Sequence, residues 1–133
     1  MYYASKIGIE LSIKNQDFII ILVKKLNFMS LSLSKIPSKE VMPGYHGKLV
    51  HTSTMTLVFW SVEKDAIVPE HHHVHEQIMH VIEGEFEFTL DGETKVYHPG
   101  DIVPIASNLP HSGKALTPCK LMDVFSPTRE EYK

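Results

Sequence analysis

The chain has 133 residues, which is enough for one domain with a hydrophobic core of its own. Its hydrophobic content of 43% and charged content of 22% are ordinary for a soluble globular protein. A net charge of -3 at pH 7, without a basic cluster interleaved with aromatic residues, argues against a nucleic-acid partner. Cys119 is the only cysteine, so an intrachain disulfide is excluded and a reducing, cytoplasmic location is expected.

Residues 1–28 are expected to form an N-terminal extension that stands apart from the rest of the chain. Their apolar run at 18–23 is far too short to cross a bilayer, and it is followed by Lys24 and Lys25 rather than by a signal cleavage site. No membrane association is therefore predicted. Three interpretations stay open: an upstream mis-start before Met29, an appended segment, or an extra strand with alternating apolar residues.

Turn signals dominate residues 30–47, and a strand-rich pattern without a convincing long helix follows them. The segment at 54–62 is β-branched and aromatic, and both of its faces are apolar, so it should be covered on both sides, by the core and by another layer or subunit. Asp91-Gly92 predicts a two-residue hairpin. The expected strands or apolar runs are 48–51, 54–62, 77–82, 85–90, 94–97, 102–105 and 120–125.

The C-terminal end carries a helix-start signal, because Ser126 suits an N-cap and Pro127 suits the first helical position. A turn or two of helix is therefore predicted over residues 128–133. Upstream of it, many short strands separated by Gly and Pro turns predict an antiparallel sandwich or barrel.

Four of the nine histidines lie within residues 71–77, and neutral imidazole is the commonest metal ligand in proteins. On an extended backbone, alternate side chains share a face, so His71, His73 and Gln77 should point to one side and His72 to the surface. His75 has the same parity and is a reserve candidate if the strand stays regular. The alternative is a chance histidine cluster on a solvated loop.

A fourth candidate ligand, His111, follows the bend at Pro110 and should begin another strand. A barrel gathers side chains from several strands into its interior, so His111 could join His71, His73 and Gln77 in one site. Three imidazoles and one amide oxygen around a divalent ion leave room for water or substrate, as catalytic metal sites require.

A second group of candidates lies near the end of the chain. Asp123 and Phe125 are two residues apart on an expected strand, so both should face the same side. Arg129 is the only arginine among thirteen Lys and Arg residues, and its planar fork suits bidentate recognition of a carboxylate. The alternative is that Arg129 pairs with surface charges and Asp123 is a satisfied edge residue.

These motifs resemble the cupin superfamily. The first cupin motif is matched by His71-x-His73, Gln77 and Gly84, and the second by Pro99-Gly100-Asp101, Pro104 and His111. An Asn usual four residues beyond the last His is Ala115 here, outside the expected metal shell. The resemblance covers about residues 36–133 and implies that residues 29–133 form an all-β cupin domain. Its expected fold is a double-stranded β-helix, or jelly-roll, barrel with a short C-terminal helical turn.

The tail from Asp123 to Arg129 resembles one group of small cupins, the pectin-degradation proteins that linearise 4,5-unsaturated monouronates. The resemblance implies metal-dependent conversion of these uronates, from pectin or alginate breakdown, to the linear keto form. It also implies a small anionic sugar substrate and one divalent transition metal ion (Ni, Zn, Mn or Fe). The implied metal ligands are His71, His73, Gln77 and His111, and the implied catalytic residues are Asp123, Phe125 and Arg129.

Two other functional classes stay open. One is a different metal-dependent cupin enzyme, such as an oxygenase or another isomerase, and the other is a non-catalytic cupin that binds a sugar or a metal. A homodimer is expected in each case, because a single small jelly roll has edge strands to protect and an apolar strand at 54–62 to cover.

Overall fold

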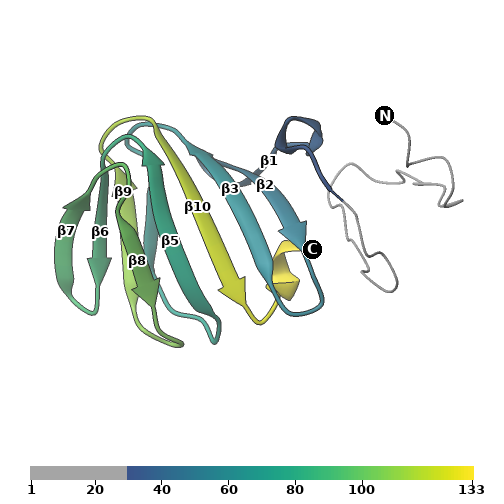
Figure 1. The fold of residues 1–133 in the computed structure, drawn as a ribbon. Coiled ribbons are helices and arrows are strands. Elements are labelled where there is room, and N and C mark those ends of the chain that lie inside the picture. The colour runs from purple at the N-terminus through teal and green to yellow at the C-terminus, as the bar shows by residue number, and fades with distance from the viewer. Residues whose placement is uncertain (1–29) are drawn as a thin grey trace, which may run out of the picture.

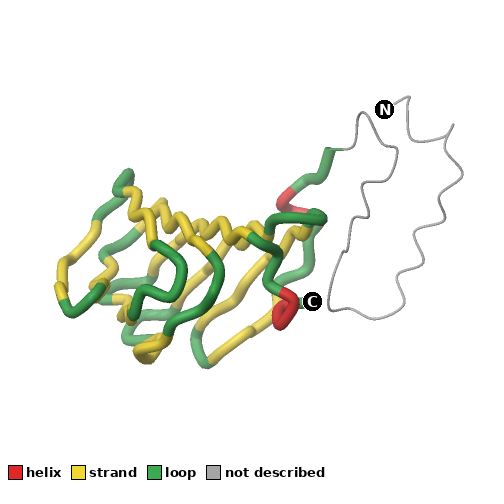
Figure 2. Tube along the Cα trace, turned by 90° about the horizontal axis from the view of Figure 1, so that it is seen from below, coloured by secondary structure: helices red, strands yellow, loops and turns green. Residues whose placement is uncertain are grey.

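The structure, a computed structural model, describes residues 30–133, so the expected extension at 1–28 lies outside the described residues. Its regular secondary structure is almost all strand, with two short 3-10 turns (Figures 1 and 2). The first three strands are β1 (Lys39–Met42), β2 (Tyr45–His51) and β3 (Thr56–Val62). The others are β4 (Ile67–His71), β5 (Glu76–Glu83), β6 (Phe86–Leu90), β7 (Glu93–Tyr97), β8 (Ile102–Ile105), β9 (His111–Ala115) and β10 (Cys119–Ser126). The 3-10 turns are η1 (Leu33–Lys35) and η2 (Glu130–Tyr132).

Two antiparallel sheets make up the fold. One has six strands in the order β1-β2-β3-β10-β5-β8, and the other has four in the order β4-β9-β6-β7. Their inner faces meet in one hydrophobic core that includes Val58, Trp60, Val81, Phe86 and Phe88. The predicted all-β class is confirmed. Among the described residues, no helix has the length and apolar composition needed to cross a bilayer.

Strand β10 lies at the centre of the six-stranded sheet, between β3 and β5 (Figure 1). Its side chains alternate, so Leu121, Asp123 and Phe125 are buried while the residues between them are more exposed. Asp123 is the register partner of Val58 on one side and of Met79 on the other, both of which are core residues. The expectation that Asp123 and Phe125 share a face therefore agrees with the structure, and this face is the barrel interior.

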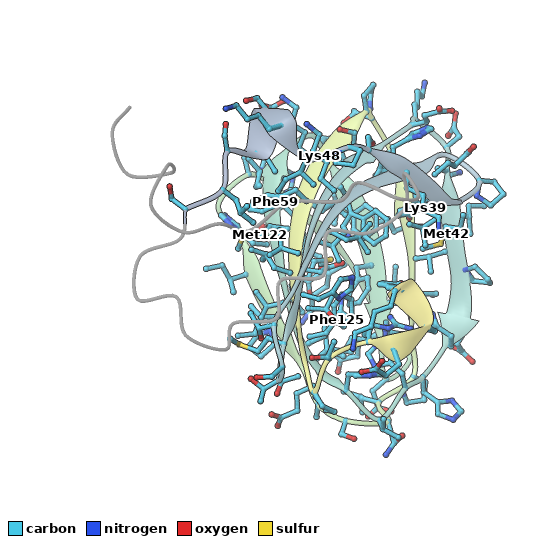
Figure 3. All side chains as sticks on the ribbon, turned by 90° about the vertical axis from the view of Figure 1, so that its right-hand side faces the viewer. Lys39, Met42, Lys48, Phe59, Met122 and Phe125 are labelled. Atoms are coloured by element: carbon cyan, nitrogen blue, oxygen red, sulfur yellow. The ribbon has the colours of Figure 1, made fainter. Side chains whose placement is uncertain are left out.

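Strand β3 has the two apolar faces that its sequence indicates. Val58 and Trp60 are buried in the core, whereas Leu57 and Phe59 are half-buried on the outer face of the six-stranded sheet. Phe59 lies beside Met122 of β10, its register partner on the same outer face (Figure 3). An apolar outer surface thus runs across neighbouring strands of this sheet.

The glycine that closes the first cupin motif is required by its position. Gly84 follows β5 with φ +87, a left-handed conformation that side-chain-bearing residues rarely adopt. A Cβ at this position would also collide with the carbonyl oxygen of Pro118. The predicted Asp91-Gly92 hairpin joins β6 to β7, and both residues have positive φ, as a type I′ turn requires.

Two expectations about local structure are corrected. The region at 30–47 is not only turns, because β1 pairs with β2 across a turn at residues 43–44. The predicted short C-terminal helical turn is present as η2, but it begins later than expected: β10 continues through Ser126, a cis peptide bond follows, and η2 begins only at Glu130.

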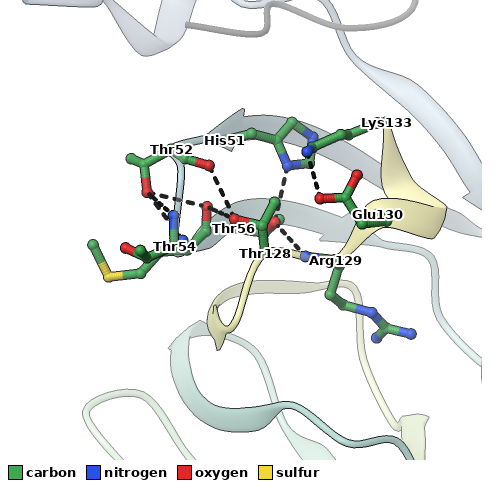
Figure 4. A network of polar contacts seen from close by, with 9 residues as sticks. His51, Thr52, Thr54, Thr56, Thr128, Arg129, Glu130 and Lys133 are labelled. Carbon is green, nitrogen blue, oxygen red and sulfur yellow. Dashed lines mark hydrogen bonds and ion pairs between the residues drawn. The ribbon is translucent and has the colours of Figure 1, made fainter. Parts of the chain in front are cut away.

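Hydrogen bonds to the β2–β3 hairpin explain why no helix begins directly at Pro127. The Thr128 hydroxyl donates to the carbonyl oxygen of Thr52 at 2.9 Å, and the Arg129 N–H donates to the Thr56 hydroxyl at 2.9 Å (Figure 4). These contacts join residues more than seventy positions apart. The second bond takes up the Arg129 N–H, which a Ser126 N-cap would otherwise accept, so tertiary contacts override the local helix-start signal.

Candidate metal centre and active site

Three histidines converge at one end of the four-stranded sheet. His71 ends β4 and His111 begins β9, and the two are register partners in the β4–β9 pair. His73 lies in the connection from β4 to β5, so it reaches the site from a bend and not from the regular strand assumed in the parity argument. One ring nitrogen of each histidine lies within 4.8 Å of those of the other two. These three histidines therefore form a candidate metal site.

The hydrogen bonds of the three rings fix their tautomers. Each Nδ1 faces a backbone carbonyl oxygen two residues away, and a carbonyl can only accept, so Nδ1 must carry the proton. The Nε2 lone pairs are therefore free to act as ligands, an arrangement typical of metal-bound histidine. The three bonds are His71 Nδ1 to Pro69 at 2.9 Å, His73 Nδ1 to His75 at 3.1 Å and His111 Nδ1 to Leu109 at 2.7 Å.

Gln77, the second residue of β5, is buried, and its Oε1 lies 3.2 Å from Nε2 of His73. With the His73 proton on Nδ1, these two atoms are both acceptors, and their lone pairs repel unless a cation lies between them. The Nε2 atom of His111 is buried without a hydrogen-bond partner among residues 30–133. A divalent ion would satisfy all of these atoms at once, so the residues present fit a metal.

Burial also favours the ligand form of two of these rings. Desolvation, with smaller contributions from the positive charges of Arg129 and of a protonated His111, lowers the pKa of His73 to about 4. Burial likewise lowers the pKa of His111. Both imidazoles are therefore neutral at pH 7, as metal coordination requires.

The remaining histidines of the cluster lie outside this set. His72 is exposed, in agreement with its expected surface position. His75 is buried, and its ring packs against His73 and Phe125, with centroids 5.4 Å and 6.4 Å away. Among the described residues, its ring is not part of the group of histidines whose nitrogens could bind a metal ion together. Its backbone carbonyl oxygen accepts the hydrogen bond that orients the His73 ring.

Asp123 faces the same cavity as the histidines. It is buried, its Oδ2 accepts a 2.8 Å hydrogen bond from Nε1 of Trp60, and its Oδ1 has no partner at hydrogen-bonding geometry among the described residues. Desolvation raises the pKa of Asp123 to about 6, although Gln77, Trp60 and Arg129 each lower it. Such a carboxyl group can both take up and release a proton near neutral pH.

Phe125 and Arg129 complete the wall of this cavity. The guanidinium carbon of Arg129 lies 4.8 Å from the Phe125 ring centroid and 4.2 Å from that of Tyr132, so it contacts two aromatic rings. The Phe125 ring also packs edge-on against His73. All seven residues expected at the site therefore lie close together, and the cavity is lined by His71, Gln77, His111, Asp123, Phe125 and Arg129.

Three further residues at the site were not identified from the sequence. Trp60 was expected only as a strand residue, yet its indole N–H holds Asp123. Tyr132 lines the cavity, and Glu131 forms an ion pair with Arg129. For Glu131 and Tyr132, the one available signal in the sequence was their position close after Arg129. Nothing in the sequence pairs Trp60 with Asp123, which is 63 positions away.

If the convergent nitrogens hold a metal, His73→Ala should lower metal affinity by at least about tenfold, because even second-shell changes commonly cost that much. The matched control is His72→Ala, which removes an exposed ring next to the site. Titration of the metal-stripped proteins with Zn²⁺ or Ni²⁺ by calorimetry measures both. An equal loss in both variants would favour the solvated histidine cluster instead.

The raised pKa of Asp123 predicts a pH-dependent cost to stability in the metal-free protein. The folded-state pKa of about 6 exceeds the ordinary 3.8, so the ionised carboxylate destabilises the fold above pH 6, and the cost disappears below pH 4. Asp123→Asn should therefore raise the free energy of unfolding by about 3 kcal/mol at pH 7–8 and leave it nearly unchanged below pH 4. Urea unfolding in the presence of a chelator measures this, and a difference independent of pH would contradict it.

Comparisons with known proteins agree with this architecture. A model of the cupin domain matches residues 58–125. The pectin degradation protein KdgF of Dickeya dadantii (strain 3937) is 31% identical over 99 residues, which cover 72% of this chain and 90% of that protein.

Solved structures give the same result. KdgF from Halomonas sp. is 34% identical with a TM-score of 0.68, over 71% of this chain and 89% of that one. An RmlC-like cupin from Shewanella frigidimarina NCIMB 400 is 28% identical with a TM-score of 0.73, over 75% of this chain and 91% of that one. The expected jelly-roll barrel is confirmed, and the chain belongs to the cupin superfamily, within which it resembles the pectin degradation proteins.

Proposed function

We propose that this protein is a metal-dependent enzyme that converts 4,5-unsaturated monouronates, from pectin or alginate breakdown, to the linear keto form. One observation carries the proposal: a proton-transferring carboxyl group, an arginine and a convergent set of ligand atoms line one cavity. The similarity to proteins named for pectin degradation supports the choice of substrate class.

His71, His73, Gln77 and His111 would hold one divalent transition metal ion (Ni, Zn, Mn or Fe). When bound, such an ion supplies Lewis acidity that polarises a substrate oxygen. The amide of Gln77 is uncharged, so this ligand set adds no negative charge that would repel an anionic sugar.

Arg129 and Phe125 are proposed to position the sugar. The Arg129 guanidinium can bind the sugar carboxylate through two parallel hydrogen bonds. Phe125 presents an apolar ring next to His73, where it would pack on the sugar and exclude water from the reacting atoms. Both side chains are buried and are held by packing, so little order has to be created when substrate binds.

Asp123 is proposed to move the proton. Trp60 holds Oδ2, which leaves Oδ1 to take the proton from the anomeric hydroxyl as the bond between the anomeric carbon and the ring oxygen breaks. The ring oxygen leaves as an enolate, and return of the proton from Asp123 to the enolate carbon gives the ketone. One proton leaves and one returns, so the reaction is an isomerisation that consumes no co-reactant.

Asp123→Asn should lower the rate of ring opening by at least about a hundredfold, because it removes the proton-transferring group. The loss of absorbance of an unsaturated uronate measures the rate, and elemental analysis should give an unchanged metal content. The matched control is Asp101→Asn, which alters an exposed aspartate in the turn before β8 and should retain full rate.

Full activity in Asp123→Asn would contradict the proposed role. Oxygen consumption by the Fe(II)-loaded wild type, without ring opening, would identify an oxygenase. Bound metal with neither activity would identify a non-catalytic cupin.

We also propose that the protein is a homodimer in which a second copy covers the outer face of the six-stranded sheet. The apolar side chains on this face include Leu57, Phe59, Ile78, Met122 and Val124. Phe59→Glu should convert a dimer into a monomer of 15.1 kDa by light scattering, because it places a charge on the apolar face. Val96→Glu, on exposed β7 of the other sheet, should stay dimeric, and a monomeric wild type would refute the proposal.

A further inference from the structure

The guanidinium of Arg129 already has a carboxylate partner inside the protein. Its Nε donates to Oε1 of Glu131 at 2.7 Å, and its Nη2 lies 2.6 Å from the same oxygen. These two nitrogens form one of the two sides of the guanidinium that can bind a carboxylate through two parallel hydrogen bonds. A sugar carboxylate that approached this side would find it occupied.

The two members of this ion pair differ in how firmly they are held. The Arg129 side chain is 10% exposed and contacts two aromatic rings, and its backbone N–H is bonded to Thr56 (Figure 4). The Glu131 side chain is 49% exposed and belongs to the three-residue turn η2. If the ion pair separates, Glu131 is therefore the residue that moves. Solvent can hydrate its half-exposed carboxylate, whereas the buried guanidinium of Arg129 is held by its two aromatic neighbours.

The size of the cavity indicates that part of its wall has to move. Its volume is about 50 Å³, which accommodates a few water molecules and not a sugar ring. This cavity is lined by Arg129 and Tyr132, which in the sequence come just before Glu130 and just after Glu131. Displacement of Glu131, which precedes Tyr132 in the turn η2, would expose the arginine at the edge of this cavity.

We propose that Glu131 is an internal competitor for the substrate carboxylate: it occupies the Arg129 fork in the free protein and is displaced when an anionic sugar binds. Two carboxylates on one side of a single guanidinium repel each other, so they exclude one another. Glu131 thereby sets the affinity for anionic sugars and leaves that for neutral sugars unchanged. The inference rests on the proposed function in one respect, namely that Arg129 binds the carboxylate of the substrate.

The test is calorimetric binding of galacturonate, a stable saturated uronate, and of galactose, its neutral counterpart, to the metal-loaded protein. Glu131→Gln should bind galacturonate about two- to fivefold more tightly than wild type, the factor expected for removing a half-exposed ion pair. Its affinity for galactose should not change. The matched control is Glu130→Gln, which makes the same charge change next to the site on a residue paired with Lys133. It should bind galacturonate as wild type does.

Unchanged or weaker galacturonate binding by Glu131→Gln would overturn the inference, because it would make Glu131 a residue that only orients Arg129. Equal tightening in Glu130→Gln would also overturn it, since net charge would then explain the effect. If galacturonate binds more tightly to Glu131→Gln but unsaturated uronates are not opened, the inference stands and the proposed reaction fails. If wild type opens unsaturated uronates and Glu131→Gln shows no tightening, the reaction stands and the inference fails.

Discussion

The candidate site depends on one kind of contact, the hydrogen bond from a histidine Nδ1 to a backbone carbonyl. Three such bonds fix the tautomers of His71, His73 and His111 and leave their Nε2 lone pairs free, and one ring nitrogen of each histidine lies within 4.8 Å of the others. The Pro69 carbonyl belongs to β4, and those of His75 and Leu109 belong to the connections that precede β5 and β9, so the antiparallel sheet positions the hydrogen-bond acceptors and the ligand atoms together. Side chains that solvent could rotate freely would not converge in this way, and the ion would have to order them at an entropic cost.

The second constraint is the central place of β10. Its alternation puts Asp123 and Phe125 on the interior face, while Trp60 from β3 and Gln77 from β5 reach Asp123 from the two neighbouring strands. Burial makes this carboxylate costly to ionise, which lowers the stability of the fold and keeps the group able to transfer a proton near neutral pH. Sites of this kind are often less stable than the fold could allow, because their groups are chosen for reactivity.

Much of this arrangement could be predicted from the sequence, since motif spacing places His71, Gln77 and His111, and strand alternation places Asp123 beside Phe125. His73 joins the site as predicted, although it lies in a bend outside β4 and not on the regular strand that the periodicity assumed. The helical turn predicted after Ser126-Pro127 begins only at Glu130, because Thr128 and Arg129 bond to the distant β2–β3 hairpin. The contacts of Trp60 with Asp123 and of Glu131 with Arg129 could not be predicted, because they depend on side-chain positions that no local pattern encodes.

The central claim is that three imidazole nitrogens and the Gln77 oxygen bind one metal ion. X-ray absorption spectroscopy of the metal-loaded protein tests it most directly. The account predicts three nitrogen ligands from imidazole at about 2.0–2.1 Å and additional oxygen ligands at similar distances, with the imidazole scattering lost stepwise in His73→Ala and His111→Ala. An ion coordinated by water and carboxylates, with no imidazole scattering, would contradict it.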